Sequence, residues 1–287
     1  MTDDLLRTAL LDLAFEMRDA AIPLMLGGGY GLYLKQVILQ ELRVTNTIIL
    51  PEFWPRPRAT EDLDVILQTE IIASLDQMKS IRSALDALNY RVIEGVKYMH
   101  FEKSLGDRGR VKIEFLTGPL PADATRGLLR IKPPRVRPEG DVKLHAYIAE
   151  EALAFEDAPT RLLIRGLLSS GEPFDAPILV PQPFTLLLMK LHAFSDRKDD
   201  ADRNLGRHHA LDLYRIVAML TRQEHASVRT MCATHRNSGP VVRATAIVAH
   251  DFATTTSIGM LRLREHELFP QRADPAQFVA ILQELFE

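Results

Sequence analysis

The first 140 residues alternate between segments with helical and with strand-like spacing of hydrophobic side chains. Residues 6–17 and 71–88 repeat an apolar side chain every three or four positions, which predicts two amphipathic helices. Residues 62–67 begin with an alternation of polar and apolar side chains, and residues 111–116 keep it throughout, which predicts half-buried strands. A short apolar run at 24–26, followed by glycines, predicts a further strand.

The last hundred residues keep only the helical spacing. Apolar stripes at 184–194 and 210–220 are followed by helical segments at 240–262 and 275–286. The preceding stretch is irregular and rich in proline, with short apolar runs. We therefore predict an α+β fold. It would consist of a mixed α/β lobe with a small mixed sheet at 1–140, connecting strands or a linker at 141–182, and an α-helical lobe at 183–287.

Composition excludes several classes of protein. The 287 residues are 46% hydrophobic and 25% charged, as in globular proteins, and the formal net charge is −3. The only cysteine, Cys232, excludes an internal disulfide and a multi-cysteine zinc site. The longest apolar run is far shorter than the roughly 20 residues that span a bilayer, and the N-terminal residues lack the pattern of a secretory signal. We therefore expect a cytoplasmic protein with no membrane partner.

Asp62 and Asp64 are the strongest chemical signal in the sequence. They are two residues apart on a predicted strand, so both side chains leave the same face of the sheet and repel each other. A divalent cation relieves this repulsion, and Mg²⁺ prefers one or two carboxylates together with substrate phosphates. Glu114, on the polar face of another predicted strand, is a candidate third carboxylate. The alternative is a strand-end turn that binds no metal.

A glycine-rich turn precedes this pair. Gly28 and Gly29 lie between the apolar run and a predicted helix start, where backbone N–H groups and the helix dipole can approach a phosphate. The turn matches neither of the two common glycine motifs for phosphate, and the alternative is a tight turn that permits close helix packing. With the strand carboxylates, the turn predicts a metal-dependent site for phosphoryl transfer.

Basic side chains mark two further segments. Residues 126–143 contain six of them: Arg126, Arg130, Lys132, Arg135, Arg137 and Lys143. They form either a solvated surface strand or a rim that contacts the phosphates of a nucleotide or an RNA. Lys190 and Arg197 are seven residues apart, so they share one face of a helix, where they contact either phosphates or neighbouring aspartates.

The order of these motifs resembles the nucleotidyltransferases of the DNA polymerase β superfamily. Within it, residues 26–32 and 58–64 are similar to the AbiEii group, toxins of bacterial type IV toxin–antitoxin systems. The segment from Lys190 to Arg197, followed by residues 211–213 around Asp212, is similar to the helical motifs of that group. The resemblance touches about a third of the residues, in the family's order, and it implies a nucleotidyltransferase-like N-terminal lobe.

The resemblance also implies roles for the residues of the N-terminal lobe. Asp62, Asp64 and Glu114 would be catalytic and would bind Mg²⁺ or Mn²⁺, with Glu114 near the attacking hydroxyl as a metal ligand or a base. Gly28 and Gly29 would cradle the triphosphate of the NTP substrate.

In the helical lobe, the resemblance makes Lys190 and Asp212 catalytic residues. Lys190 and Arg197 would bind nucleotide phosphates, and Asp212 would orient a basic group or the acceptor. His209 lies near a position where relatives often carry a basic residue, so it is a further candidate.

The implied activity is Mg²⁺-dependent transfer of an NMP from an NTP to a hydroxyl acceptor, an RNA such as a tRNA 3′ end, with an antitoxin encoded nearby as partner. Two alternatives remain open: the same transfer to a small-molecule or protein hydroxyl, and a nucleotide-binding protein without turnover. Two departures from the family pattern concern the acceptor. Gly29 stands where a small hydroxyl residue is usual, and residues 42–58 form an inserted loop in which Trp54 either anchors the loop or stacks on a base.

Overall fold

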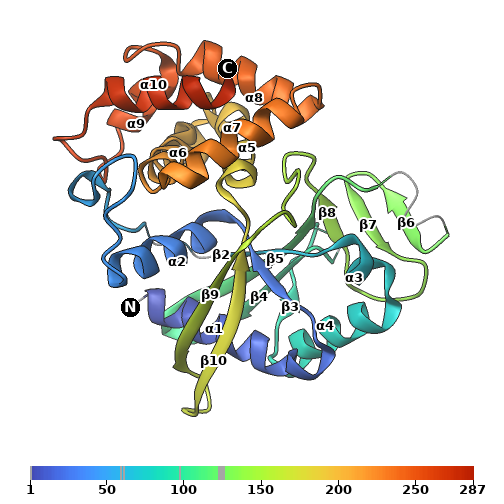
Figure 1. The fold of residues 1–287 in the computed structure, drawn as a ribbon. Coiled ribbons are helices and arrows are strands. Elements are labelled where there is room, and N and C mark those ends of the chain that lie inside the picture. Colours follow the sequence, from blue (N-terminus) through green and yellow to red (C-terminus); the bar gives the residue numbers. More distant parts are fainter. Residues whose placement is uncertain (1, 59, 61, 97, 122–126) are drawn as a thin grey trace. The chain divides into compact units, whose positions relative to one another are not determined.

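The computed structural model describes residues 2–58, 60, 62–96, 98–121 and 127–287 (Figure 1). The chain forms two compact units. The first comprises Met1–Leu34, Ala59–Glu150 and Ala154–Pro181, and the second comprises Lys35–Arg58, Glu151–Leu153 and Gln182–Glu287. The first unit contains the sheet and the second is helical, so the predicted α+β fold class is confirmed.

The strands of the first unit that the structure describes form one mixed sheet. They are β1 (Leu24–Leu26), β2 (Asp62–Ile66), β3 (Arg91–Val92), β4 (His100–Ser104), β5 (Arg110–Thr117), β6 (Leu129–Lys132), β7 (Arg135–Pro138), β8 (Ala146–Ile148), β9 (Thr160–Leu167) and β10 (Pro173–Val180). Their order is β6–β7–β8–β5–β2–β1–β10–β9, and β4 pairs with both β3 and β5. The predicted strands at 24–26, 62–67 and 111–116 are confirmed as β1, β2 and β5.

Residues 141–182, expected as connecting strands or a linker, contribute β8, β9 and β10 to this sheet. Strands β9 and β10 form a long antiparallel hairpin, and β10 pairs in parallel with β1. The reason is an alternation within the short apolar runs. On β9, Leu162 and Ile164 are buried, and their neighbours at 161, 163 and 165 are exposed. On β10, Ile178 and Val180 are buried.

Two helices cover one face of this sheet, as Figure 1 shows for α1 (Thr2–Glu16) and α4 (Leu75–Ala87). Leu63 and Val65 of β2 are buried on this side. The helix predicted over 71–88 is interrupted, because Ser74 ends α3 (Thr69–Ala73) and caps α4 by accepting a hydrogen bond from the Gln77 backbone N–H. Serine favours this capping position over a helix interior.

The second unit is built from α5 (Pro183–Arg197), α6 (Arg207–Ala218), α7 (Arg222–Thr234), α8 (Gly239–Asp251), α9 (Ile258–Arg264) and α10 (Pro275–Phe286). Aromatic rings of Phe194, Tyr214, Phe252 and Phe278 pack at its centre. The helix predicted over 240–262 is divided into α8 and α9. Hydroxyl side chains at 254–257 hydrogen-bond to nearby backbone and to one another, which competes with helix formation.

Residues 42–58 belong to the second unit and contain a short 3₁₀ turn, Pro51–Phe53. Trp54 is buried, and its indole N–H donates to the Ile49 carbonyl at 3.0 Å. The Pro55 carbonyl accepts a hydrogen bond from the buried amide of Gln36. Trp54 therefore anchors this loop, and its burial argues against the alternative of stacking on a base. No helix within the described ranges is long and apolar enough to cross a membrane.

Candidate functional site

The three predicted carboxylates lie on one face of two adjacent strands of the first unit. In the parallel pairing of β2 with β5, Asp62 is opposite Lys112 and Asp64 is opposite Glu114. Opposite residues of paired strands project to the same side, about 4.8 Å apart across the sheet. We call this side the carboxylate face. It is the side opposite to that of Leu63 and Val65, which α1 and α4 cover.

Two nitrogen groups accompany the carboxylates. Lys112 Nζ lies 3.7 Å from Asp62 Oδ1, and His100 Nδ1 on β4 lies 3.2 Å from Glu114 Oε1. Burial lowers the pKa of His100, although Asp62 and Asp64 act to raise it, so the imidazole is neutral near pH 7. Three carboxylates and one lysine then leave a net charge of about −2 on this part of the face, which favours a divalent cation.

The oxygens of the carboxylate face meet the requirements of Mg²⁺. Asp62 Oδ1 is hidden from solvent and accepts no hydrogen bond from the described residues, and its ion-pair partner Lys112 Nζ is 3.7 Å away, so this oxygen can accept a closer cation. Within the same ranges, no three His, Cys, Asp or Glu side chains are arranged to hold a metal ion on their own. Because Mg²⁺ needs only one or two carboxylates when substrate phosphates complete its shell, the carboxylate oxygens fit this ion.

Gly28 is packed directly against Asp64. A Cβ atom at position 28 would overlap the Asp64 carboxylate, and φ of Gly28 is +59°, in the left-handed region that favours glycine. The Gly27 N–H donates to the Asp64 carbonyl at 2.9 Å, which fixes this approach. Helix α2 (Gly28–Glu41) begins here, so its first turn, with Gly28 and Gly29, starts beside the carboxylate face. The first N–H groups of a helix have no partner within the helix and bind anions.

The second unit has a buried carboxylate among three cations. Asp212 on α6 is completely buried, and its Oδ2 accepts from Lys190 Nζ on α5 at 2.7 Å. Arg215 Nη1 donates to Asp212 Oδ1 at 3.0 Å, and Arg58 Nη2 lies 3.5 Å from Oδ2. Arg215 also donates to Gln36 Oε1 at 2.8 Å. One carboxylate therefore holds three basic groups in place.

Asp212 and its three basic partners carry a net positive charge. Burial alone would raise the pKa of Asp212, but Lys190, Arg58 and Arg215 outweigh it and hold the pKa well below its usual 3.8. The carboxylate is therefore ionised, and the four side chains carry a net charge of about +2. Cations in a poorly hydrated place attract anions more strongly than cations in water do.

Arg197 and His209 extend the same cluster. The guanidinium of Arg197 contacts His209 Nε2, and burial lowers the pKa of His209 well below 6.5, assisted by the charges of Lys190 and Arg197. The imidazole is therefore neutral, and its Nε2 accepts from Arg197 while Nδ1 is buried without a hydrogen-bond partner in the described part of the chain. The structure thus brings Lys190, Arg197 and Asp212 together in the second unit.

Three residues of these two sites were missed from the sequence. Arg58 stands at the start of the 58–64 segment that carries the family resemblance, so a signal was present. Arg215 follows Asp212 by three positions on one helix, a spacing at which side chains meet. His100 had no sequence signal, because only the β4–β5 register places it opposite Glu114.

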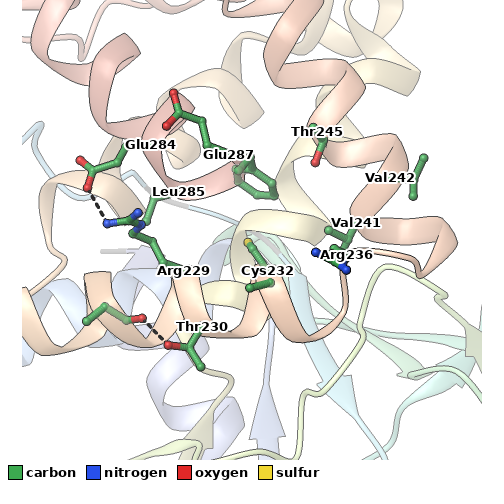
Figure 2. Close-up of a pocket in the computed structure, with 13 residues that line it drawn as sticks. Arg229, Thr230, Cys232, Arg236, Val241, Val242, Thr245, Glu284, Leu285 and Glu287 are labelled. Carbon is green, nitrogen blue, oxygen red and sulfur yellow. Dashed lines mark hydrogen bonds and ion pairs between the residues drawn. The ribbon is translucent and has the colours of Figure 1, made fainter.

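A separate cavity of about 670 Å³ lies in the second unit between α7, α8 and α10, as Figure 2 shows. None of the predicted site residues lines it, whereas Cys232 does. Burial raises the pKa of the Cys232 thiol to about 12, so this group is not a thiolate nucleophile at neutral pH. Arg229 at the edge of the cavity is paired with Glu284 at 3.0 Å.

Of the basic segment, Arg130, Lys132, Arg135 and Arg137 lie on the β6–β7 hairpin of the first unit. Lys143 follows β7, and Arg126 lies outside the described residues.

Comparison with known proteins identifies the family of this chain. Residues 52–286 match the family described as the nucleotidyl transferase AbiEii toxin of the type IV toxin–antitoxin system. A search of curated proteins finds no match. The solution structure of the antibiotic-resistance factor ANT(2'')-Ia is similar at 13% identity and a TM-score of 0.37, over 82% of this chain and 97% of that chain. Because the family match covers most of the chain, including both sets of candidate side chains, this protein belongs to the AbiEii family of toxins and is a nucleotidyltransferase.

Proposed function

We propose that this nucleotidyltransferase transfers an NMP from an NTP to a hydroxyl of an RNA, such as the 3′ end of a tRNA. The observation that carries the proposal is the packing of Gly28, at the start of α2, against Asp64 on the carboxylate face. A helix N-terminus binds phosphates, and paired carboxylates bind the cation that accompanies them. Their juxtaposition is what a triphosphate substrate requires.

The side chains that would hold Mg²⁺, or Mn²⁺ in its place, are Asp62 and Asp64, with Glu114 as a further oxygen donor. When bound, the ion stabilises negative charge on the transferred phosphoryl group and on the leaving pyrophosphate. The N–H groups of Gly28 and Gly29 would contact the triphosphate. Glu114, which lies 3.2 Å from the neutral His100, would be oriented by it.

In the reaction, the acceptor hydroxyl oxygen attacks the α-phosphorus, and the bond from the α-phosphorus to the bridging oxygen of the β-phosphate breaks. Pyrophosphate leaves, and we assign Glu114 as the group that accepts the hydroxyl proton. In the second unit, Asp212 positions Lys190 and Arg58, and His209 positions Arg197. We assign these cations to phosphate groups of an NTP or RNA substrate, with which Lys and Arg form charge-assisted hydrogen bonds.

Family membership adds a biological setting to this chemistry. A type IV toxin–antitoxin system includes an antitoxin, so we propose an antitoxin encoded nearby as the partner that opposes this activity. We place the reaction in the cytoplasm, where NTP and tRNA are available.

The proposal is tested by incubating the protein with Mg²⁺, each α-labelled NTP in turn, and total tRNA. We expect Asp64→Asn to lower labelling of the RNA roughly 100- to 1000-fold, the effect of losing one electrostatic contact in a transition state. Asp175→Asn is the matched control, because Asp175 is an exposed strand aspartate that is paired with Arg165.

Equal turnover by Asp64→Asn and the wild type would contradict the assignment of the carboxylate face. Binding of NTP without labelling of any RNA would instead favour a small-molecule or protein acceptor. Thermal unfolding of each variant shows whether the fold is retained.

A further inference from the structure

Four basic side chains project from one side of the β6–β7 hairpin. In its antiparallel pairing, Arg130 is opposite Arg137 and Lys132 is opposite Arg135. Like charges directly opposite each other destabilise a strand pair. An anionic partner would relieve this repulsion and stabilise a hairpin that has two such pairs. Glu139 compensates only part of this charge, through its bond from Arg130 Nη2 at 2.8 Å.

The remaining three cations keep their charge available. In the part of the chain that the structure describes, the side chains of Lys132 and Arg135 form no hydrogen bond or ion pair, although their backbones are paired in the hairpin. Arg137 Nη1 donates to the backbone carbonyls of Pro138 and Gly140, at 3.1 and 2.6 Å, so its charge is held in place without being neutralised. The hairpin therefore presents a net charge of about +3 on this side.

Strand register places these cations on the carboxylate face. Arg135 is opposite Tyr147 in the β7–β8 pairing, and Tyr147 is opposite Leu116 in the β5–β8 pairing. Leu116 is two residues beyond Glu114, so both project to the same side of β5. From Glu114 to Arg135, two strand spacings and two residues of rise correspond to about 12 Å. A few nucleotides of an extended chain span such a distance.

An aromatic side chain lies between the carboxylates and the cations. Tyr147 on β8 is 41% exposed. Its position in the register puts its ring beside Arg135 and on the same side as Glu114. Single-stranded nucleic acids are bound by this combination, in which bases stack on aromatic rings and basic groups follow the phosphates. An acidic protein segment would satisfy the charges but has no use for an exposed ring at this place.

We propose that the β6–β7 hairpin and Tyr147 form the binding surface for the single-stranded end of the acceptor RNA. Lys132, Arg135 and Arg137 contact its phosphates, and a base stacks on Tyr147. The inference rests on the proposed function, because it gives the acceptor of that reaction a place on the face that carries Asp64 and Glu114.

The test measures RNA binding without NTP and without turnover. A fluorescein-labelled, unstructured single-stranded RNA is titrated with the full chain at several salt concentrations, and binding is followed by anisotropy. The double variant Lys132→Gln/Arg135→Gln should reduce the slope of log K against log[salt] by about 1.4, because each phosphate contact to a single strand contributes about 0.7. The matched control is Arg161→Gln/Arg165→Gln, two exposed cations on β9 at the other edge of the sheet, which should leave the slope unchanged.

Tyr147 is tested by two substitutions. Tyr147→Ala should weaken RNA binding roughly 5- to 150-fold, the range of one lost base stack, and Tyr147→Phe should retain the wild-type affinity. A ring that served only the fold would change thermal unfolding in the alanine variant without changing RNA affinity, which would overturn its assignment.

The outcomes separate the inference from the proposed function. If the wild type labels RNA but the hairpin double variant keeps its RNA affinity and salt slope, the inference is wrong and the transfer activity stands. If the hairpin variants lose RNA affinity but the wild type transfers no nucleotide, the RNA-binding surface stands, whereas its role in holding an acceptor is wrong together with the proposed function. Absence of RNA binding by the wild type would also overturn the inference. Poly-glutamate serves as a probe for an acidic protein partner: if the double variant loses binding to poly-glutamate but keeps its binding to RNA, the inference is wrong.

Discussion

Replacing Asp212 by asparagine removes the one negative charge from a group of three cations inside the second unit. Lys190 and Arg215, which are both buried, lose a partner at 2.7 and 3.0 Å. Arg58 is 18% exposed and retains some access to water. Breaking a buried ion pair from one side costs about 3–5 kcal/mol, because the remaining charges stay in a poorly hydrated place. We expect Asp212→Asn to lower the free energy of unfolding by this amount.

The prediction is measured by chemical denaturation and by thermal unfolding. At about 2–4 °C per kcal/mol for a domain of 150–250 residues, the expected decrease in Tm is roughly 6–20 °C. Asp196→Asn is the matched control, since Asp196 lies on α5 in the same unit and is paired with Arg243, but its side chain is 60% exposed. An exposed pair contributes about 0–1 kcal/mol. Equal effects of the two substitutions would refute the reasoning about burial.

The difference in unfolding free energy between the wild type and Asp212→Asn should also depend on pH, which provides an independent check. The pKa of Asp212 in the folded protein lies below its usual 3.8, so its ion pairs stabilise the fold fully above that value. This stabilisation is lost as the pH falls below 3.8 and the carboxylate becomes protonated. The difference in unfolding free energy between the wild type and Asp212→Asn should therefore be constant near neutral pH and decrease in acid. A difference that increased in acid would contradict the assignment.

Two further substitutions and one labelling experiment follow from the structure. Gly28→Ala should abolish transfer, because the added Cβ overlaps the Asp64 carboxylate. The control is Gly171→Ala, which also has a positive φ but has open space around it, so it should only reduce Tm. Equal turnover by the two variants would count against the role of Gly28. Cys232 should resist iodoacetamide at pH 8 in the native protein and react in denaturant, because a pKa of about 12 leaves roughly 1 thiol in 10⁴ ionised. Rapid labelling of the native protein, detected by mass spectrometry, would contradict the burial of this thiol.

Long periodic segments were the part of the fold that the sequence predicted best. The stripe at 184–194 became α5, and the alternation at 111–116 became β5. Helix α7 was missed because only Val228 and Cys232 are buried on it, which is too few for a visible stripe. A local signal was nevertheless present. Thr221 and Glu224 form a capping box at its start, a pattern that can be read three residues apart in a sequence.

For the candidate sites too, the sequence predicted local geometry but not contacts between distant residues. The spacing of Asp62 and Asp64 was sufficient to predict that they share a face, because strand geometry is local. The contact of Arg58 with Asp212 joins residues 154 positions apart, and no local pattern determines it. The position of Tyr147 on the carboxylate face likewise depends on two strand registers, which only the folded sheet defines.

The central claim is that the protein transfers the nucleotidyl group of an NTP to RNA. Parallel reactions with α-labelled and γ-labelled NTP, Mg²⁺ and total tRNA test it most directly. We predict that the α-label enters the RNA, that the γ-label leaves as pyrophosphate, and that Asp64→Asn lowers both roughly 100- to 1000-fold. Entry of the γ-label into the RNA would show transfer of a phosphoryl group instead, and the same labelling by Asp64→Asn as by the wild type would contradict the role of the carboxylate face.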